Sequence, residues 1–283
     1  CDDTDVSSTV LADDADCDGV VAAEDCDDTD VSSTVVADDA DCDSVIAEDD
    51  CDDTDPTIVG CWLSADAGSY HTCGRTAFGT VECWGRDGFG QANPPTGTFT
   101  TLSGGIYNTC GVRVSGEVAC WGRNSAGESS PPSGTFESVD TYDFHSCGVT
   151  TSGTVVCWGQ DDFGQATPPS GVFEMVSTGY RHTCGVTTSG SIQCWGSNRD
   201  GESDPPSGTF TSVSAGWAYS CGVRVSGEVA CWGRNSVGES IPPSGTFDSV
   251  AANEWHACGV TTAGTAECWG YDDYGQASPP LGA

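Results

Sequence analysis

A unit of 37 residues recurs six times between residues 61 and 283, and this repeat constrains the fold more than any other feature of the chain. Each unit contains the triplet Cys-Trp-Gly, a second Cys ten residues before it and a Pro-Pro pair after it. The triplets start at Cys83, Cys120, Cys157, Cys194, Cys231 and Cys268. Pro and Gly at these intervals exclude long helices, and a unit this short cannot bury a core alone, so the units must stack on one another.

Within one unit, the residue pattern predicts three short strands. In the fifth unit these are FTSVSAG (210–216), SCGVRV (220–225) and EVACWG (228–233), which are bounded by Ser and Gly. A variable turn joins the first two strands, and a tight hairpin joins the last two. The sequence therefore predicts an all-β fold over residues 61–283, and stacked units of this length favour a radial array, a β-propeller.

The spacing of the Cys residues selects the hairpin loop. A three-residue loop, Val225 to Gly227, sets Cys221 directly opposite Cys231, whereas a two-residue loop does not. Gly stands at the third loop position in all six units, where the left-handed conformation is needed. We therefore expect six cross-strand disulfides: Cys73–Cys83, Cys110–Cys120, Cys147–Cys157, Cys184–Cys194, Cys221–Cys231 and Cys258–Cys268.

The units resemble the regulator-of-chromosome-condensation repeat. The resemblance is carried by GWAYSCGVRVSGEVACWGRNSVGE (216–239) in the fifth unit and by AGSYHTCG (67–74) with the following CWG in the first. It is closer to the short, Cys-containing version in secreted bacterial proteins and to the propeller type of β-lactamase inhibitory protein. The resemblance implies a binding platform. Propellers of this kind usually have seven blades, so six units leave open a closed ring, an open arc and a ring completed by a neighbour.

Residues 1–60 form a second repeat system, rich in Asp, with a period of 25. The segment CDDTDVSSTVLADDADCDGVVAAED (1–25) is followed by CDDTDVSSTVVADDADCDSVIAEDD (26–50), and Pro56 breaks a third copy. The whole chain has 43 acidic and 8 basic residues and a net charge of −35; about half of the acids lie in this segment, which has no basic residue. Such a segment cannot compact alone, so either it is disordered or cations are built into it.

Two stretches of the segment have the spacing of a calcium-binding loop, with acidic residues at positions 1, 3, 5 and 12. These residues are Asp14, Asp16, Asp18 and Asp25 in the first copy and Asp39, Asp41, Asp43 and Asp50 in the second, and Val20 and Val45 would supply the carbonyl oxygen at position seven. Alternate Asp residues on a tight turn converge several carboxylates on one hard cation, so the predicted cofactor is calcium. The alternatives are a solvated acidic linker and zinc, although linkers do not repeat this spacing and the segment has no His.

No amphipathic helices flank these loops, so the segment is not an EF-hand. DADCDG (14–19), EDCDDTD (24–30) and EDDCDDTDP (48–56) resemble thrombospondin type 3 repeats and the DCDDTDP metal-binding motif of secreted bacterial proteins. The resemblance implies that further carboxylates complete the calcium shells or bind further ions: Asp27, Asp28, Asp30, Asp52, Asp53 and Asp55. The spacing of Cys17–Cys26 and Cys42–Cys51 fits clamps around the loops. The remaining two, Cys1 and Cys61, can pair with each other or between chains.

The turn before the hairpin carries an aromatic residue in each unit, at positions that vary from unit to unit. These residues are Tyr70, Tyr107, Phe144, Tyr180, Trp217 and Trp255. A face that binds a glycan or a protein would vary in this way on a constant frame, with its aromatic side chains on one rim. The alternative is loop drift without function.

Four histidines share one position of the repeat: His71, His145, His182 and His256. We expect hydrogen-bonded structural roles for them, because equivalent residues of different blades do not converge.

The composition excludes several classes of function. The negative charge argues against nucleic acid and anionic membranes as partners, and no apolar run reaches the ~18 residues of a membrane span. Eighteen Cys predict an extracellular or cell-surface location. The chain has no nucleophile elbow, no phosphate-binding loop and no Lys, so we do not expect an enzyme.

The sequence begins in mid-repeat at Cys1. This suggests a processed product or part of a longer protein, and the alternative is a lipidated bacterial N-terminus.

Two functions follow as hypotheses. The first is a calcium-binding structural or adhesive protein that joins copies of itself into an oligomer or filament through residues 1–60. The second is a monomeric binding module, lectin-like or inhibitor-like, whose propeller rim binds an extracellular glycan or protein while the calcium segment acts as a stalk. Self-association separates the two.

Overall fold

Eighteen strands, three from each 37-residue unit, make up the regular structure of residues 62–279, the part of the chain that the computed structural model describes. Their bounds are β1 Trp62–Ala67, β2 His71–Thr76, β3 Val81–Gly85, β4 Phe99–Gly104, β5 Asn108–Arg113, β6 Val118–Gly122, β7 Phe136–Thr141, β8 His145–Thr150, β9 Val155–Gly159, β10 Phe173–Thr178, β11 His182–Thr187, β12 Ile192–Gly196, β13 Phe210–Ala215, β14 Tyr219–Arg224, β15 Val229–Gly233, β16 Phe247–Ala252, β17 His256–Thr261 and β18 Ala266–Gly270. The predicted calcium loops and the Cys17–Cys26 and Cys42–Cys51 clamps lie outside the described residues.

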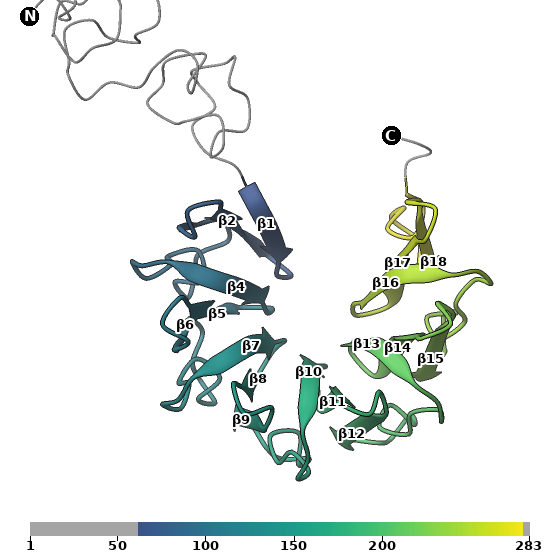
Figure 1. Ribbon diagram of the computed structural model, residues 1–283. Helices are drawn as coiled ribbons and strands as arrows, with labels where there is room; N and C mark the ends of the chain where they lie inside the picture. Colours follow the sequence, from purple (N-terminus) through teal and green to yellow (C-terminus); the bar gives the residue numbers. More distant parts are fainter. Residues whose placement is uncertain (1–61, 280–283) are drawn as a thin grey trace, which may run out of the picture. The chain divides into compact units, whose positions relative to one another are not determined.

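The strands form six antiparallel sheets of three, each made from one unit in chain order (Figure 1). The predicted all-β propeller is confirmed, and the strands of the fifth unit, β13, β14 and β15, each begin and end within one residue of the predicted bounds. Grouped by their contacts, the described residues fall into two compact parts that do not follow the repeat boundaries. The larger part is 65–74 with 81–279, and the smaller is 62–64 with 75–80. Within residues 62–279 no helix is long and apolar enough to cross a membrane.

The hairpin has the predicted three-residue loop. Cys221 pairs with Cys231 in the register of β14 and β15, and the Arg224 N–H donates to the Glu228 carbonyl at 2.8 Å to close the loop. Gly227 has a φ of +88°, and the five equivalent glycines are also left-handed, between +79° and +85°. All six predicted disulfides are present: Cys73–Cys83, Cys110–Cys120, Cys147–Cys157, Cys184–Cys194, Cys221–Cys231 and Cys258–Cys268.

The apolar core lies between successive units rather than inside any one of them. In the interface between the second and third units, Cys110 and Val112 of one unit pack against Phe136, Val139 and Trp158 of the next. The other interfaces repeat this arrangement. A single sheet therefore buries its apolar face only when a neighbour covers it.

The Trp of the Cys-Trp-Gly triplet completes each of these interfaces. Trp158 packs edge-on against Phe136, with ring centroids 6.2 Å apart, and its Nε1–H donates to the Glu128 carbonyl of the preceding unit at 2.8 Å. The five Trp residues that follow another described unit are 7–9% exposed. In the first unit, which follows none of the described units, Trp84 is 49% exposed. Burial of this side chain thus depends on the unit before it.

Removal of one disulfide tests its contribution to a single blade. The double variant Cys221→Ala, Cys231→Ala should lower the free energy of unfolding by about 2–3 kcal/mol. The effect is modest because the two Cys are only ten residues apart in the sequence, so the disulfide closes a short loop in the unfolded chain. Urea denaturation of both proteins measures the difference. An unchanged midpoint would mean that packing between units alone fixes the hairpin.

Candidate functional site

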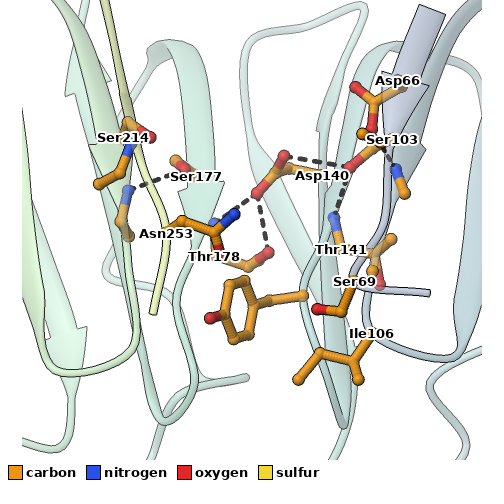
Figure 2. Close-up of a pocket in the computed structure, with 16 residues that line it drawn as sticks. Asp66, Ser69, Ser103, Ile106, Asp140, Thr141, Ser177, Thr178, Ser214 and Asn253 are labelled. Carbon is orange, nitrogen blue, oxygen red and sulfur yellow. Dashed lines mark hydrogen bonds between the residues drawn. The ribbon is translucent and has the colours of Figure 1, made fainter. Parts of the chain in front are cut away.

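Side chains from all six units converge at two places, and the first is an inner pocket of about 150 Å³ at the ends of the first strands (Figure 2). One side-chain oxygen from each of the first five units accepts a hydrogen bond there from a backbone N–H of the next unit. The donor and acceptor pairs are Gly104 to Asp66 at 2.6 Å, Thr141 to Ser103 at 3.0 Å, Thr178 to Asp140 at 2.5 Å, Ala215 to Ser177 at 3.1 Å and Ala252 to Ser214 at 2.9 Å. These bonds join the units.

The carboxylate of Asp140 is fully used in this network. One oxygen accepts from the Ser103 hydroxyl at 3.2 Å, and the other accepts from both the N–H and the hydroxyl of Thr178. Burial raises the pKa of Asp140 to about 6 and also raises the pKa of Asp66. No group of three or more His, Cys, Asp or Glu in the described part of the chain is arranged to hold a metal ion. The inner pocket is therefore a structural junction.

The histidines that share one position of the repeat also join units. The imidazole Nε2 of His71, His145 and His182 lies 2.6–2.8 Å from a Thr or Ser hydroxyl of the next unit. Burial lowers the pKa of His145 to about 3 and that of His182 to about 4, so both rings are neutral near pH 7. In the second unit, the Asn108 side-chain amide also bonds to the next unit, but at a different position: it donates to the Thr141 hydroxyl at 2.8 Å. His71, His145 and His182 thus act as hydrogen-bonded links between units.

The second place is one edge of the sheets, which we call the aromatic edge. It is formed by the turn between the first and second strands of each unit and by the loop that follows the third strand, because antiparallel pairing brings both to the same end of the blade. The Arg123 N–H donates to the Tyr107 carbonyl at 2.9 Å and ties loop to turn. Gly122 precedes it with a φ of +99°, and a Cβ there would lie 2.5 Å from that carbonyl oxygen. The Gly of Cys-Trp-Gly therefore permits this contact.

The aromatic side chains singled out from the sequence all lie at this edge, and five of them stack across neighbouring units. Tyr70 stacks on Tyr107 with centroids 5.3 Å apart. Tyr180, Trp217 and Trp255 form a continuous stack at 5.6 Å and 5.3 Å. Each ring comes from a different blade, so the stack extends the edge over three units. Phe144 has no such stack, but the guanidinium of Arg123 lies 3.9 Å from its ring centroid.

Arginine side chains lie on these rings throughout the edge, and sequence reasoning missed this. Arg86 lies over Tyr70 and Tyr107, Arg123 over Tyr107 and Phe144, Arg181 over Tyr180, and Arg234 over Trp217 and Trp255, at 3.8–5.5 Å from the centroids. All six aromatic side chains thus carry a guanidinium, which makes the edge both apolar and cationic. The signal in the sequence was the residue after each Cys-Trp-Gly triplet, which is Arg in the first, second and fifth units.

Carboxylates hold two of these arginines in place. Arg123 pairs with Glu128 at 2.9 Å and with Asp143, and Arg234 pairs with Glu239 at 3.5 Å. Burial disfavours the charge on Glu128, but N–H donors of its loop and Arg123 outweigh burial and keep its pKa below the usual value. Arg86, Arg181 and Arg199 make no ion pair with a carboxylate among residues 62–279.

The loop after the third strand adds further aromatic side chains that sequence reasoning missed. Phe89 packs edge-on against Tyr107, and Arg181 and Arg199 both lie over Phe163. Tyr271 and Tyr274 occupy the same loop of the sixth unit. The segments GFGQ, DFGQ and DYGQ, each with an aromatic residue two before Gln, could have indicated them. The predicted calcium ligands and the pairing of Cys1 and Cys61 lie outside the described residues.

Comparison with known proteins relates the chain to one repeat type. The Regulator of chromosome condensation (RCC1) repeat matches residues 64–91, 136–165, 176–202, 210–239 and 247–276, which is just over half of the chain. This confirms the resemblance stated from the sequence for residues 61–283. No curated protein matches the chain.

Solved structures with the same fold include two plant receptor ectodomains. The CRINKLY WD40 ectodomain of the Arabidopsis thaliana receptor kinase ACR4 superposes with a TM-score of 0.66 at 26% identity, over 78% of this chain and 83% of that one. The ectodomain of the Physcomitrella patens receptor kinase CR4 gives 0.65 at 28% identity over 75% of this chain, and the match spans only 62% of that ectodomain. Prp20p of Saccharomyces cerevisiae gives 0.66 at 16% identity over 74% and 72%, which shows the fold alone.

The buried histidines predict a dependence of stability on acid. The pKa of His145 is about 3 in the folded protein and 6.5 in the unfolded chain, so stability is intact above pH 6.5 and is lost as the pH falls toward 3. His145→Asn, which copies the second unit, should reduce the loss of unfolding free energy between pH 7.5 and pH 4.5 by about 2 kcal/mol. Urea denaturation at both pH values measures it. Asp140 is present in both proteins and its own titration cancels in the difference, so an equal pH dependence would contradict the assignment.

Proposed function

The chain belongs to the regulator of chromosome condensation (RCC1) repeat family, and from this premise we propose that it is an extracellular binding module whose aromatic edge holds a glycan or protein partner. Six disulfides support an oxidising, extracellular location. The two plant receptor ectodomains of 26–28% identity are consistent with that location. A propeller that presents variable loops on a fixed frame is suited to binding.

The stack of Tyr180, Trp217 and Trp255 is the observation that carries this proposal. Its rings are partly exposed, Trp217 stacks on both Tyr180 and Trp255, and each of the three rings also has a guanidinium near it. Side chains fixed in this way lose little conformational entropy when a partner covers them. Large, preorganised aromatic surfaces of this kind supply most of the binding energy in many interfaces.

Charge favours a partner with polar or acidic groups beside an apolar surface. Arg86 and Arg199 are exposed and Arg181 is partly exposed, and none of the three is neutralised by a carboxylate within residues 62–279. Guanidinium groups stacked on aromatic rings keep their outward N–H donors free for carboxylate or hydroxyl oxygens. Both an extended glycan and a peptide segment meet these requirements.

A matched pair of variants tests the edge as a binding surface. Trp217→Ala should weaken binding of any ligand that the protein captures on a glycan array or a panel of cell-surface proteins by about thirtyfold, because it removes the middle of the stack. Val114→Ala is the control, since Val114 is 69% exposed in the hairpin loop at the opposite end of its blade. Surface plasmon resonance with the captured ligand measures both. Equal affinity of the two variants would place the binding surface elsewhere.

A second candidate function is calcium-dependent assembly of copies of this chain through residues 1–60. The observation that favours it is the repeated Asp-x-Asp-x-Asp spacing at Asp14–Asp18 and Asp39–Asp43, in a segment without a single basic residue. Calcium would neutralise the carboxylates and stiffen the segment, which could then join or space the propellers.

Particle mass in calcium and in chelator tests this candidate. In millimolar calcium, light scattering and negative-stain microscopy should detect oligomers or filaments that dissociate on chelation. The double variant Asp14→Asn, Asp39→Asn should remain monomeric in calcium, because each loop loses the ligand at its first position. Asp248→Asn, an exposed carboxylate of β16, serves as the control of charge. A monomer under all conditions would leave the binding module as the function.

A further inference from the structure

A cleft of about 530 Å³ lies at the end of the aromatic edge, between the first turn of the first unit and the turn and loop of the sixth. We call it the end cleft. Its aromatic walls are Tyr70, Trp255, Tyr271 and Tyr274, and its polar lining includes Glu254 and His256. Its volume is in the range of sites that take small molecules, and it combines apolar walls with a few polar groups as such sites do.

Two of these aromatic walls, Tyr271 and Tyr274, differ from the rest of the edge because no guanidinium of the described residues lies over their rings. Elsewhere each ring of the aromatic stack carries an arginine of the protein itself, such as Arg234, which lies 3.8 Å from the Trp255 centroid. In the sixth unit the position of Arg234 is taken by Tyr271. Tyr271 and Tyr274 pack edge-to-face at 6.2 Å, and neither has a guanidinium over its ring among the described residues. Tyr271 and Tyr274 thus add ring faces without a guanidinium to the end cleft, whereas Tyr70 lies against Arg86 and Trp255 lies against Arg234.

The charges around the end cleft are negative. Glu254 is exposed in its wall, and the loop of Tyr271 continues with the exposed residues Asp272 and Asp273. No Arg or Lys lines the cleft. The chain as a whole has a net charge of −35, and this field attracts cations and repels anions. An anionic ligand is therefore disfavoured beside Glu254, Asp272 and Asp273.

His256 adds polarity without positive charge. In the first, third and fourth units the corresponding imidazole bonds to a hydroxyl of the next unit, as His145 does to Thr183 at 2.8 Å. His256 belongs to the sixth unit, and its side chain has no hydrogen-bond partner within residues 62–279. Burial lowers its pKa, and the nearby Asp272 only partly offsets this. A neutral imidazole adds no positive charge to the cleft near pH 7 and offers a ring nitrogen to a ligand hydroxyl.

From these observations we propose that the end cleft binds a small organic cation with a quaternary or alkylated ammonium group, held by the faces of Tyr271 and Tyr274 and by the carboxylate of Glu254. Ammonium groups stripped of N–H donors are weakly hydrated and gain most from aromatic faces, which is why cages of this composition recognise them. The site goes beyond the proposed function, since it does not require that the aromatic edge bind a glycan or protein.

Choline and its uncharged isostere 3,3-dimethylbutan-1-ol provide the test. Isothermal titration calorimetry at constant ionic strength should show saturable binding of choline with a dissociation constant of about 1 mM. The isostere has the same shape and hydroxyl but no charge, and it should bind at least about tenfold more weakly. Equal binding of the two compounds, or no saturable binding of choline, would overturn the proposal.

Variants separate a specific site from general attraction by the acidic protein. Tyr274→Ala and Glu254→Gln should each weaken choline binding by about fivefold, and Tyr274 is 89% exposed, so its removal leaves the core intact. Glu137→Gln makes the same charge change on the exposed face of β7 and should have no effect. If Glu137→Gln weakened choline binding as much as Glu254→Gln, the effect would be one of diffuse charge and the proposal would fail.

The Tyr274→Ala protein also distinguishes this site from the proposed function. Tyr274 is not part of the stack of Tyr180, Trp217 and Trp255. The variant should therefore bind choline more weakly while it retains full affinity for the partner captured by the aromatic edge. Loss of partner binding in Trp217→Ala has no bearing on the choline titration, so each proposal can fail alone.

Discussion

Packing of each unit against the one before it determines the rest of the structure, because three short strands have no interior of their own. From the second unit onward, the Trp of the triplet packs into the apolar interface with the preceding unit, and its indole N–H donates to a carbonyl there, as Trp158 does to Glu128. A buried N–H without an acceptor costs about 1–3 kcal/mol. Rotation or sliding of one unit against the next would therefore lose the apolar burial and this hydrogen bond together, and the two terms select one arrangement.

The residue that accepts this bond also builds the aromatic edge. The side chain of Glu128 accepts from the Ala126 N–H at 2.6 Å and from Arg123 at 2.9 Å, while its carbonyl holds Trp158. Glu202 and Glu239 close their own loops in the same way and hold Trp232 and Trp269. Fold and edge are thus linked through single residues. The core thus fixes the guanidinium groups that pair with these Glu side chains. This gives the edge a preorganised surface although it consists of turns and loops.

The sequence predicted what is local to one unit. The Cys pairs and the Gly of the hairpin sufficed for the strands, the register and the six disulfides, because hairpin geometry depends on a few consecutive residues. Contacts between units could not be predicted in this way. The stacking of Trp217 on Trp255, and the contact of the Arg234 guanidinium with both rings, depend on the rotation from one blade to the next. The sequence placed both rings on one rim but gave no reason to join Arg234 to them, since it lies far from either in the chain.

Near-identical units also limit what a repeat protein can bind. Six equal edges would present six equal surfaces, so a ligand that binds once must use a place where one unit differs from the rest. The sixth unit differs at Tyr271, where the fifth has Arg234, and its His256 has no following unit among the described residues to bond. Its core positions are kept, with Phe247 packed on Trp269 and Trp269 bonded to Glu239. The differences therefore lie at the end cleft, where they cost the fold little, and they give that cleft a chemistry that no other described interface repeats.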